Sequence, residues 1–257
     1  MGVVNVTPDS FSDGGRWFDH AAAVEHGRQL IAEGADIVDV GGESTRPGSA
    51  PVDESEELRR VIPVVAELSG LGARVSVDTR KPAVAAAAVD AGASIVNDVS
   101  ASMEMADVVA RARRAGGVGW IAMHMQGSPE TMQADPHYDD VVAEVRDFLV
   151  ERAEKAVAAG IDPAQIWIDP GIGFGKRVGH NLSLLRHLRT LVGTGWPVAV
   201  GASRKWFIGQ LTGGAPAEDR LEGSLALASW AAAEGAAIVR VHDVAPTVQA
   251  LRLVGAA

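Results

Sequence analysis

A short pattern recurs along this chain and constrains its fold more than any other feature of the sequence. It joins the end of a helix to a Gly and then to an apolar run rich in Ile and Val. Gly readily adopts the left-handed conformation that ends many helices, and such a run is typical of a strand buried in a parallel sheet. The copies are EGADIVDV (33–40), AGASIVND (91–98), EGAAIVRV (234–241) and, more loosely, GVGWIAMH (117–124). The pattern predicts repeated helix-to-strand connections in a parallel α/β protein.

Runs of the same kind predict eight strands that alternate with helices. The strands are expected over residues 2–6, 36–41, 73–78, 93–97, 119–124, 165–169, 197–202 and 237–242. The helices are expected near residues 20–33, 53–69, 82–91, 103–115, 139–159, 181–192, 218–234 and 246–254. The strand ends lie about 34 residues apart, which is close to one strand–helix unit.

Eight such units predict a (β/α)₈ or TIM barrel, a fold of about 250 residues; a doubly wound parallel sheet is the alternative. No linker rich in Pro, Gly or Ser divides the sequence, so we expect a single domain over residues 1–257. Two long connections, residues 7–19 and 42–52, follow the first two strands on the face where barrel enzymes build their sites. Long loops in a compact domain are often lids, so we expect two mobile loops there.

Charge and composition narrow the function classes. Lys and Arg total 23 against 33 Asp and Glu, a formal net charge of -10 without any basic block, which argues against a nucleic-acid partner. Cys is absent, which excludes disulfides, thiolate metal sites and a cysteine nucleophile and fits a reducing compartment. No apolar run approaches the roughly 18 residues of a membrane helix, and no signal-peptide pattern is present. We therefore expect a cytoplasmic protein without a membrane or nucleic-acid partner.

Polar side chains stand at the end of every predicted strand. They are Asn5, Asp39, Asp78, Asn97, His124, Asp169, then Ser203 with Lys205, and finally Arg240 with His242. Asp39, Asn97 and Arg240 each lie five residues after the Gly of the repeat, so we expect them in one layer with one orientation. A single buried Asp is usually structural. Burying so many polar groups costs several kcal/mol unless partners are supplied, which indicates a bound polar ligand.

The types of these residues indicate what the ligand carries. Hydrogen-bond acceptors come from Asp39, Asp78, Asn97 and Asp169, and they match a donor-rich edge such as that of a pterin or guanine. Groups suited to phosphate or carboxylate come from Arg46, Arg204, Lys205, Arg240 and His242, with the hydroxyl of Thr45. Together they predict a heterocycle with an anionic tail.

Other motifs are less specific. DPGIGFGK (169–176) lacks the GxxxxGK[ST] spacing of a phosphate loop, so we interpret its glycines as a tight turn and Phe174 as a ring that could cover a ligand. The four residues His26, His137, His180 and His187 form no metal-binding pattern and are interpreted as surface or capping residues. A Gly-x-Ser-x-Gly elbow is absent, so a hydrolase triad is unsupported.

The sequence resembles the dihydropteroate synthase family of folate biosynthesis, in stretches that follow in order along nearly the whole chain. They are MGVVNVTPDSFSDGG (1–15), DVGGESTRPG (39–48), SVDTRKP (76–82), NDVSA (97–101), MHMQGSPETMQ (123–133), DPGIGFGK (169–176), GASRK (201–205) and RVHDV (240–244). NVTPDSFSDGG and GGESTRPG together are the most specific. A catalytically silent pterin-binding paralogue and a pterin-dependent methyltransferase barrel remain as alternatives.

The resemblance implies a transferase that joins 4-aminobenzoate to 6-hydroxymethyl-7,8-dihydropterin diphosphate, with Mg²⁺ as cofactor and a homodimer as the assembly. It implies that the pterin is bound by Asp39, Asp78, Asn97, Asp169, Lys205 and Arg240. It implies that the diphosphate is bound by Asn5, Thr45, Arg46, Arg240 and His242, with Asn5 at the metal. Aminobenzoate would be enclosed by Phe11, Pro47, Phe174 and Lys205, and catalytic roles would fall on Asp78, Lys205, Arg46 and Asp13.

The implied chemistry is an SN1-like displacement. Mg²⁺ and cations neutralise the leaving diphosphate, a nearby carboxylate such as Asp78 stabilises the methylene cation, and the arylamine attacks it. One position departs from the family pattern: Trp206 stands where many members carry a small hydroxyl residue near the aminobenzoate carboxylate. We expect Trp206 to affect the aminobenzoate half of the site more than the pterin half.

Overall fold

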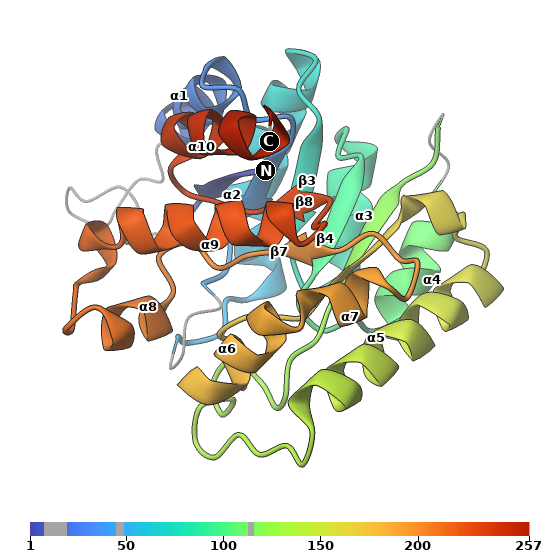
Figure 1. Cartoon of the computed structure of the whole chain (residues 1–257). Helices are drawn as coiled ribbons and strands as arrows, with labels where there is room; N and C mark the ends of the chain where they lie inside the picture. The colour runs from blue at the N-terminus through green and yellow to red at the C-terminus, as the bar shows by residue number, and fades with distance from the viewer. Residues whose placement is uncertain (8–19, 45–48, 113–115, 257) are drawn as a thin grey trace.

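The computed structural model describes residues 1–7, 20–44, 49–112 and 116–256 of the chain. Parallel strands alternate with helices through these ranges, and the helices lie outside the strands (Figure 1). The strands are β1 Gly2–Asn5, β2 Val38–Gly41, β3 Val75–Asp78, β4 Ile95–Asp98, β5 Gly119–Met123, β6 Ile166–Asp169, β7 Ala199–Val200 and β8 Ile238–Val239. The helices are α1 His20–Ala32, α2 Glu54–Gly70, α3 Pro82–Asp90, α4 Met103–Arg111, α5 Val141–Ala158, α6 Val178–Arg186, α7 Leu188–Val192, α8 Trp206–Leu211, α9 Leu221–Ala233 and α10 Val244–Ala256.

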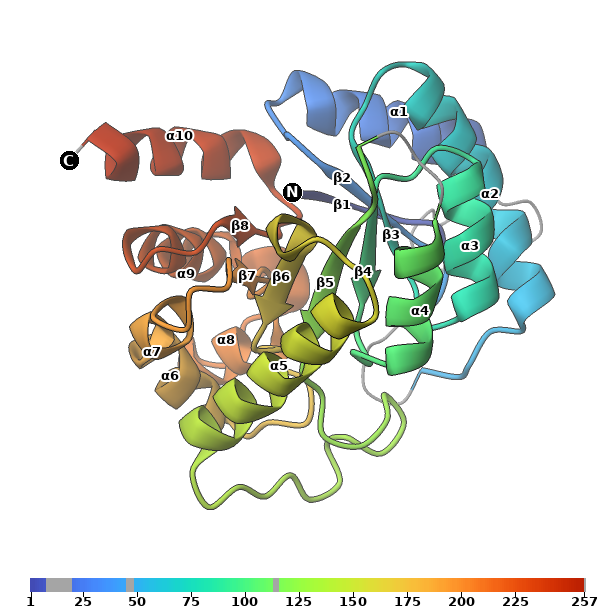
Figure 2. The ribbon, with the colours of Figure 1, turned by 90° about the vertical axis from the view of Figure 1, so that its right-hand side faces the viewer.

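The strands close into a barrel. Strands β1 to β6 form one parallel sheet in sequence order, and β7 pairs with β8. Single parallel bridges, Ile168 with Val198 and Gly2 with Val241, join the two sheets at both edges. In Figure 2, α1 to α4 cover one side of the strands, and α6, α7, α9 and α10 cover the other. This is the predicted (β/α)₈ barrel; residues 8–19 and 45–48 of the two long loops lie outside the described ranges.

The last two strands are shorter than the sequence predicts. The predictions were 197–202 and 237–242, but each strand has only two laddered residues. Pro197 has no N–H for the ladder. Beyond Val239 the chain changes partner, because the N–H of Val241 donates to Met1 O at 2.9 Å. Continuous pairing between β7 and β8 therefore stops early.

Two helix predictions also need correction. The single helix expected near 181–192 is divided into α6 and α7 at His187, whose backbone (φ -107°, ψ 27°) leaves the helical region and whose ring contacts Ser183 O. The short helix α8 was not predicted, because six residues give too little periodicity to recognise. The predicted helix starts agree with the structure: Pro82 occupies the first turn of α3, and α2 carries three Glu in its first turn.

The barrel interior has an apolar floor. Five buried side chains, Ile37, Ile95, Ile121, Ala199 and Ile238, form a cluster inside the strands, separate from the larger core between strands and helices. Side chains two apart on a strand point to the same face. Residues two positions after Ile37, Ile95 and Ile238 therefore also point inward, one layer closer to the carboxyl ends of the strands. Within the described ranges, no helix is both long and apolar enough to span a membrane.

Candidate active site

The layer above the apolar floor is organised around Arg240. Its Nε donates to Asp39 Oδ2 at 2.6 Å, and its Nη2 donates to Asp78 Oδ2 at 2.7 Å. Asn97 Nδ2 donates to the same Asp39 oxygen at 3.0 Å. The prediction that Asp39, Asn97 and Arg240 share a layer is thus confirmed. Burial opposes the charge of Arg240, but the two carboxylates outweigh it and raise its pKa.

Two acceptor atoms beside this cluster are left over. The side chain of Asp39 is fully buried, and its Oδ1 has no hydrogen-bond partner within the described part of the chain. The same holds for the fully buried Oγ of Ser76, the residue paired in register with Asp39. Buried polar atoms are nearly always hydrogen-bonded. An unpaired carboxylate oxygen at this depth therefore marks a place for a donor on a ligand or on water.

Burial also sets the protonation of Asp78. Desolvation raises the pKa of this carboxyl to about 7, although Arg240 pulls it down; Asp39 and Glu57 add to the increase. Asp78 therefore takes up a proton at a higher pH than an ordinary carboxyl does. A ligand that donates hydrogen bonds favours the ionised form.

Lys205 and Phe174 form a second feature of the site. Lys205 Nζ lies 3.9 Å from the centre of the Phe174 ring and donates to Ile172 O at 2.5 Å. Lys205 caps the start of α8, and Phe174 belongs to the loop after β6. Burial lowers the pKa of Lys205 to about 7, while Asp169 raises it. The pair presents an ammonium stacked on an aromatic ring, as expected for residues that enclose a planar ligand.

The glycines after β6 form the predicted tight turn. Gly171, Gly173 and Gly175 all have positive φ, at 64°, 86° and 58°. A Cβ on Gly171 would lie 1.9 Å from His124 O, so only glycine fits there. Asp169 supports the turn, because its Oδ1 accepts the Gly171 N–H at 2.7 Å. Burial raises the pKa of Asp169.

Lys176 is an important residue that sequence reasoning missed. Its side chain is fully buried; Nζ donates to Phe174 O at 2.9 Å and lies 3.0 Å from His124 Nδ1. Burial lowers the pKa of Lys176 to about 7, and burial together with this lysine lowers that of His124 to about 3. The neutral ring of His124 can accept a hydrogen bond from the Lys176 amine at Nδ1. The available signal was a Lys directly after a Gly-rich turn on the carboxyl face of the barrel.

A second missed network lies behind Asp78. Lys81 Nζ donates to Glu43 at 2.5 Å and also to Glu57, whose side chain is 1% exposed. Thr79 Oγ1 donates to Glu57 at 2.6 Å. Glu57 was interpreted only as part of an acidic helix start, which it is. It also links α2 to the segment after β3.

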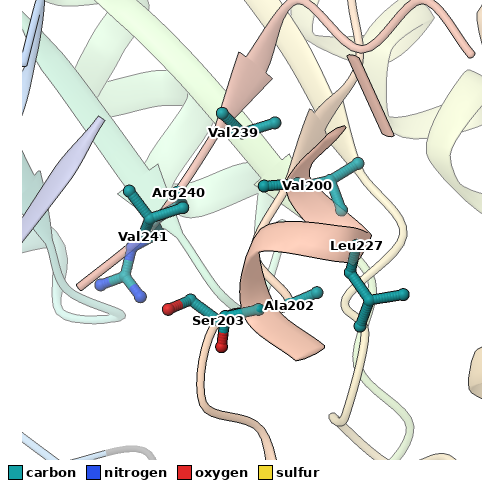
Figure 3. Close-up of a pocket in the computed structure, with 9 residues that line it drawn as sticks. Val200, Ala202, Ser203, Leu227, Val239, Arg240 and Val241 are labelled. Carbon is teal, nitrogen blue, oxygen red and sulfur yellow. The ribbon is translucent and has the colours of Figure 1, made fainter. Parts of the chain in front are cut away.

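The ends of β7 and β8 are joined by side chains. His242 N donates to Ser203 Oγ at 3.2 Å. Arg204 makes a two-pronged ion pair with Asp243, at 2.9 and 2.5 Å. Asp243 thus engages the guanidinium of Arg204, one of the cations that the sequence suggested for an anionic group. In Figure 3, the Arg240 guanidinium points away from Leu227 and α9; the void between them measures about 10 Å³, room for one water at most.

Other predicted site residues are placed as follows. Asn5 ends β1, half-buried and in register with Gly41. The residues Phe11, Asp13, Thr45, Arg46 and Pro47 lie outside the described ranges. His180 caps α6, since its Nδ1 accepts the Arg177 N–H at 3.2 Å, and His137 is largely exposed, as predicted.

Comparisons with known proteins agree with this geometry. The family described as "Pterin binding enzyme" matches residues 1–242. The dihydropteroate synthase of Mycobacterium leprae is 51% identical over 265 residues, covering 100% of this chain and 92% of that protein. The solved structure of Xanthomonas albilineans dihydropteroate synthase with 4-aminobenzoic acid has a TM-score of 0.92 and 52% identity, covering 100% of this chain and 91% of that one. The Yersinia pestis dihydropteroate synthase, solved with a sulfonamide drug, has a TM-score of 0.92 and 44% identity, with coverages of 100% and 92%.

Proposed function

The chain belongs to the dihydropteroate synthase family of pterin-binding enzymes, and from this premise we propose how its described side chains perform the reaction. The enzyme is a transferase of folate biosynthesis. It condenses 6-hydroxymethyl-7,8-dihydropterin diphosphate with 4-aminobenzoate, and it releases diphosphate and 7,8-dihydropteroate.

The pterin ring binds in the layer above the apolar floor. The observation that carries this assignment is the buried Asp39 Oδ1, which has no hydrogen-bond partner among the described residues. Its carboxylate accepts from Asn97 and shares Arg240 with Asp78. Carboxylate and amide oxygens accept the N–H groups along the amino-oxo edge of the ring. Arg240, held by Asp39 and Asp78, lies against the ring with its charge already compensated.

Aminobenzoate binds further out, against Phe174 and Lys205. An aromatic acid gains from stacking on the Phe174 ring and from the nearby ammonium of Lys205. The Xanthomonas albilineans relative was solved with 4-aminobenzoic acid and the Yersinia pestis relative with a sulfonamide drug. We therefore expect sulfonamides to compete with aminobenzoate here; Phe11 and Pro47 would complete the enclosure.

The diphosphate lies toward Asn5, Arg240 and His242, with Thr45 and Arg46 as further contacts. No three His, Asp or Glu side chains gather into a metal cage within the described ranges. Mg²⁺ usually keeps several waters and binds through one or two protein oxygens plus substrate phosphates. The half-buried amide of Asn5 fits that role. When bound, Mg²⁺ would neutralise charge that develops on the leaving diphosphate.

The displacement proceeds through a cation. The methylene C–O bond breaks first, and its electron pair leaves with the diphosphate. The dihydropterin ring delocalises the resulting positive charge, and the ionised Asp78 stabilises it in a site shielded from water. The amino group of aminobenzoate then forms the new C–N bond and loses one proton, so no strong general base is required.

A direct assay tests the function. Purified protein is mixed with the dihydropterin diphosphate, 4-aminobenzoate and Mg²⁺, and both products are followed. Aminobenzoate-dependent formation of both, abolished in Lys205→Ala and Asp78→Ala, supports the proposal. Lys155→Ala and Asp139→Ala, on exposed side chains, are the matched controls. Pterin binding without product would indicate a silent paralogue, and methyl transfer from a folate would indicate the methyltransferase.

The enzyme assembles as a homodimer through α9. This helix exposes Ala226, Trp230 and Ala233, and Trp230 is 46% exposed. The indole N–H of Trp230 donates to Leu185 O at 2.9 Å. Exposed apolar faces of this kind mark interaction sites, and one helix face can pair with its own copy about a two-fold axis. Sedimentation should show a dimer that Trp230→Glu dissociates. Leu71→Glu, on an exposed apolar residue after α2, should leave the dimer intact.

We place the enzyme in the cytoplasm. Its diphosphate substrate carries charges that a hydrocarbon layer excludes, so the enzyme must work in the compartment where that substrate is made. Fractionation of the source cells that recovered the activity outside the cytoplasm would contradict this location.

A further inference from the structure

The two site residues Lys205 and His242 lie beyond the paired part of their strands. Ala199 pairs with Ile238 and Val200 with Val239, and the last backbone bond of this ladder runs from Arg240 N to Val200 O at 2.9 Å. The ladder therefore does not fix the separation between the two side chains. Some other contact must hold the two strand ends together.

Side chains make that contact. Ser203 Oγ lies 3.1 Å from His242 Nδ1 and accepts the His242 N–H. One residue after Ser203 and one after His242, the guanidinium of Arg204 donates to both carboxylate oxygens of Asp243. A two-pronged Arg–carboxylate pair fixes orientation as well as distance. The pair is only partly exposed, at 36% for Arg204 and 20% for Asp243, so solvent screens it less than a surface pair.

The backbone of Arg204 is held in an unusual conformation. Its φ of 57° lies in the left-handed region, which is strained for a residue with a side chain. Its N–H donates to Ser224 Oγ at 2.9 Å, and its carbonyl accepts from Arg220 Nη1 at 3.0 Å. This turn leads into α8 and places Lys205 at the N-cap position of that helix. Several groups therefore cooperate to place one short segment.

We propose that Arg204 and Asp243 are positioning residues that fix Lys205 relative to His242 across the ends of β7 and β8. The inference rests on the proposed function, in which His242 lies at the diphosphate half of the substrate, together with the pterin contact that the family resemblance implies for Lys205. A substrate that spans both groups needs a fixed distance between them. The bare pterin alcohol, which lacks the diphosphate, does not.

Binding of two ligands tests the pair. The variants are Asp243→Asn and Arg204→Asn; Asn tolerates the left-handed backbone but lacks the guanidinium. We expect the Kd of the dihydropterin diphosphate to increase about tenfold in each, while that of the 6-hydroxymethyl pterin changes less than about twofold. The double variant should lose no more affinity for the dihydropterin diphosphate than the single variant with the larger loss, because both substitutions break the same contact. Asp243→Glu should recover most of the affinity, and Asp107→Asn, in the exposed pair with Arg111, should have no effect.

Three results would overturn the proposal that Arg204 and Asp243 act together as positioning residues. Equal loss for both pterins would indicate general damage to the barrel. Losses that multiply in the double variant would indicate independent roles. Full affinity in Asp243→Asn with strong loss in Arg204→Asn would make Arg204 a direct phosphate ligand. Because the readout is binding, a wild-type protein that binds the diphosphate but yields no dihydropteroate would refute the proposed reaction and leave this test intact.

Discussion

The two sides of the site are built in different ways. The acceptor wall, formed by Asp39, Asp78, Asn97 and Asp169, stands on strands of the six-stranded sheet, where three or four residues pair with each neighbour. The cation wall, formed by Lys205, Arg240 and His242, follows strands with two paired residues each. Backbone hydrogen bonds fix the first wall, and side-chain bonds complete the second. Conservative side-chain changes should therefore disturb the cation wall more than the acceptor wall.

The largest effect is expected where the two walls meet. Arg240→Met leaves Asp78 and the fully buried Asp39 without their cation. Removing one partner from a buried ion pair costs about 3–5 kcal/mol, so we expect the free energy of unfolding in urea to fall by that amount and activity to vanish. Arg111→Met, which breaks an exposed pair with Asp107, should cost less than about 1 kcal/mol. A similar small loss for Arg240→Met would mean that the walls are independent.

The next effect distinguishes the walls by pH. Asp78, with its pKa raised to about 7, is mostly protonated below that pH, and a pterin that donates hydrogen bonds must displace the proton. Pterin affinity should therefore rise as pH rises toward 7, by up to about tenfold per unit, and level off above it. Binding measured from pH 5.5 to 8.5 checks this. Asp78→Asn should flatten the curve, and a rise that persists in this variant would exclude Asp78 as its cause.

A smaller effect, confined to the KM of one substrate, is expected from Lys176→Met. The apolar side chain fills similar space but leaves the Phe174 carbonyl without its donor. An unmet buried acceptor costs about 1–3 kcal/mol, and the displaced Phe174 should increase the KM for aminobenzoate about 5- to 30-fold with little change in that for the pterin. Lys155→Met, on α5, is the control. An increase confined to the pterin KM would show that Lys176 serves the acceptor wall through Asp169.

The smallest effect is expected at the first residue of α8. Trp206 packs its indole against the main core, and its Nε1 is buried without a partner in the described part of the chain. Trp206→Ser should change the KM for aminobenzoate a few-fold, about the effect of one hydrogen bond, and that for the pterin less. Steady-state kinetics with each substrate varied in turn measures both. Equal changes would separate Trp206 from the aminobenzoate half.

The acceptor wall was also the more predictable of the two. The Gly spacing of the repeat placed Asp39 and Asn97 of the acceptor wall in one layer, and on the cation wall it reached only Arg240. Strand geometry converts equal spacing into equal orientation, and hydrogen bonds confirm the layer. The pairing of Arg204 with Asp243 could not be predicted in that way. Periodicity tells which face a residue occupies, but it does not tell which opposite charge it will meet across 39 positions of sequence.

The same limit explains the missed lysines and the short strands. The side-chain partners of Lys176 and Lys81, such as His124 and Glu57, come from other connections of the barrel. The length of β8 depends on a change of partner from β7 to β1 at Val241, a property of barrel closure. Local sequence contains neither piece of information.

The apolar floor of the barrel has a consequence for the order of binding. Ile37, Ile95 and Ile238 lie one layer beneath Asp39, Asn97 and Arg240, so the interior below the proposed pterin layer is filled by apolar side chains. In the proposed arrangement the pterin lies deeper in the barrel than the aminobenzoate does. We therefore expect the pterin to load first and the aminobenzoate second.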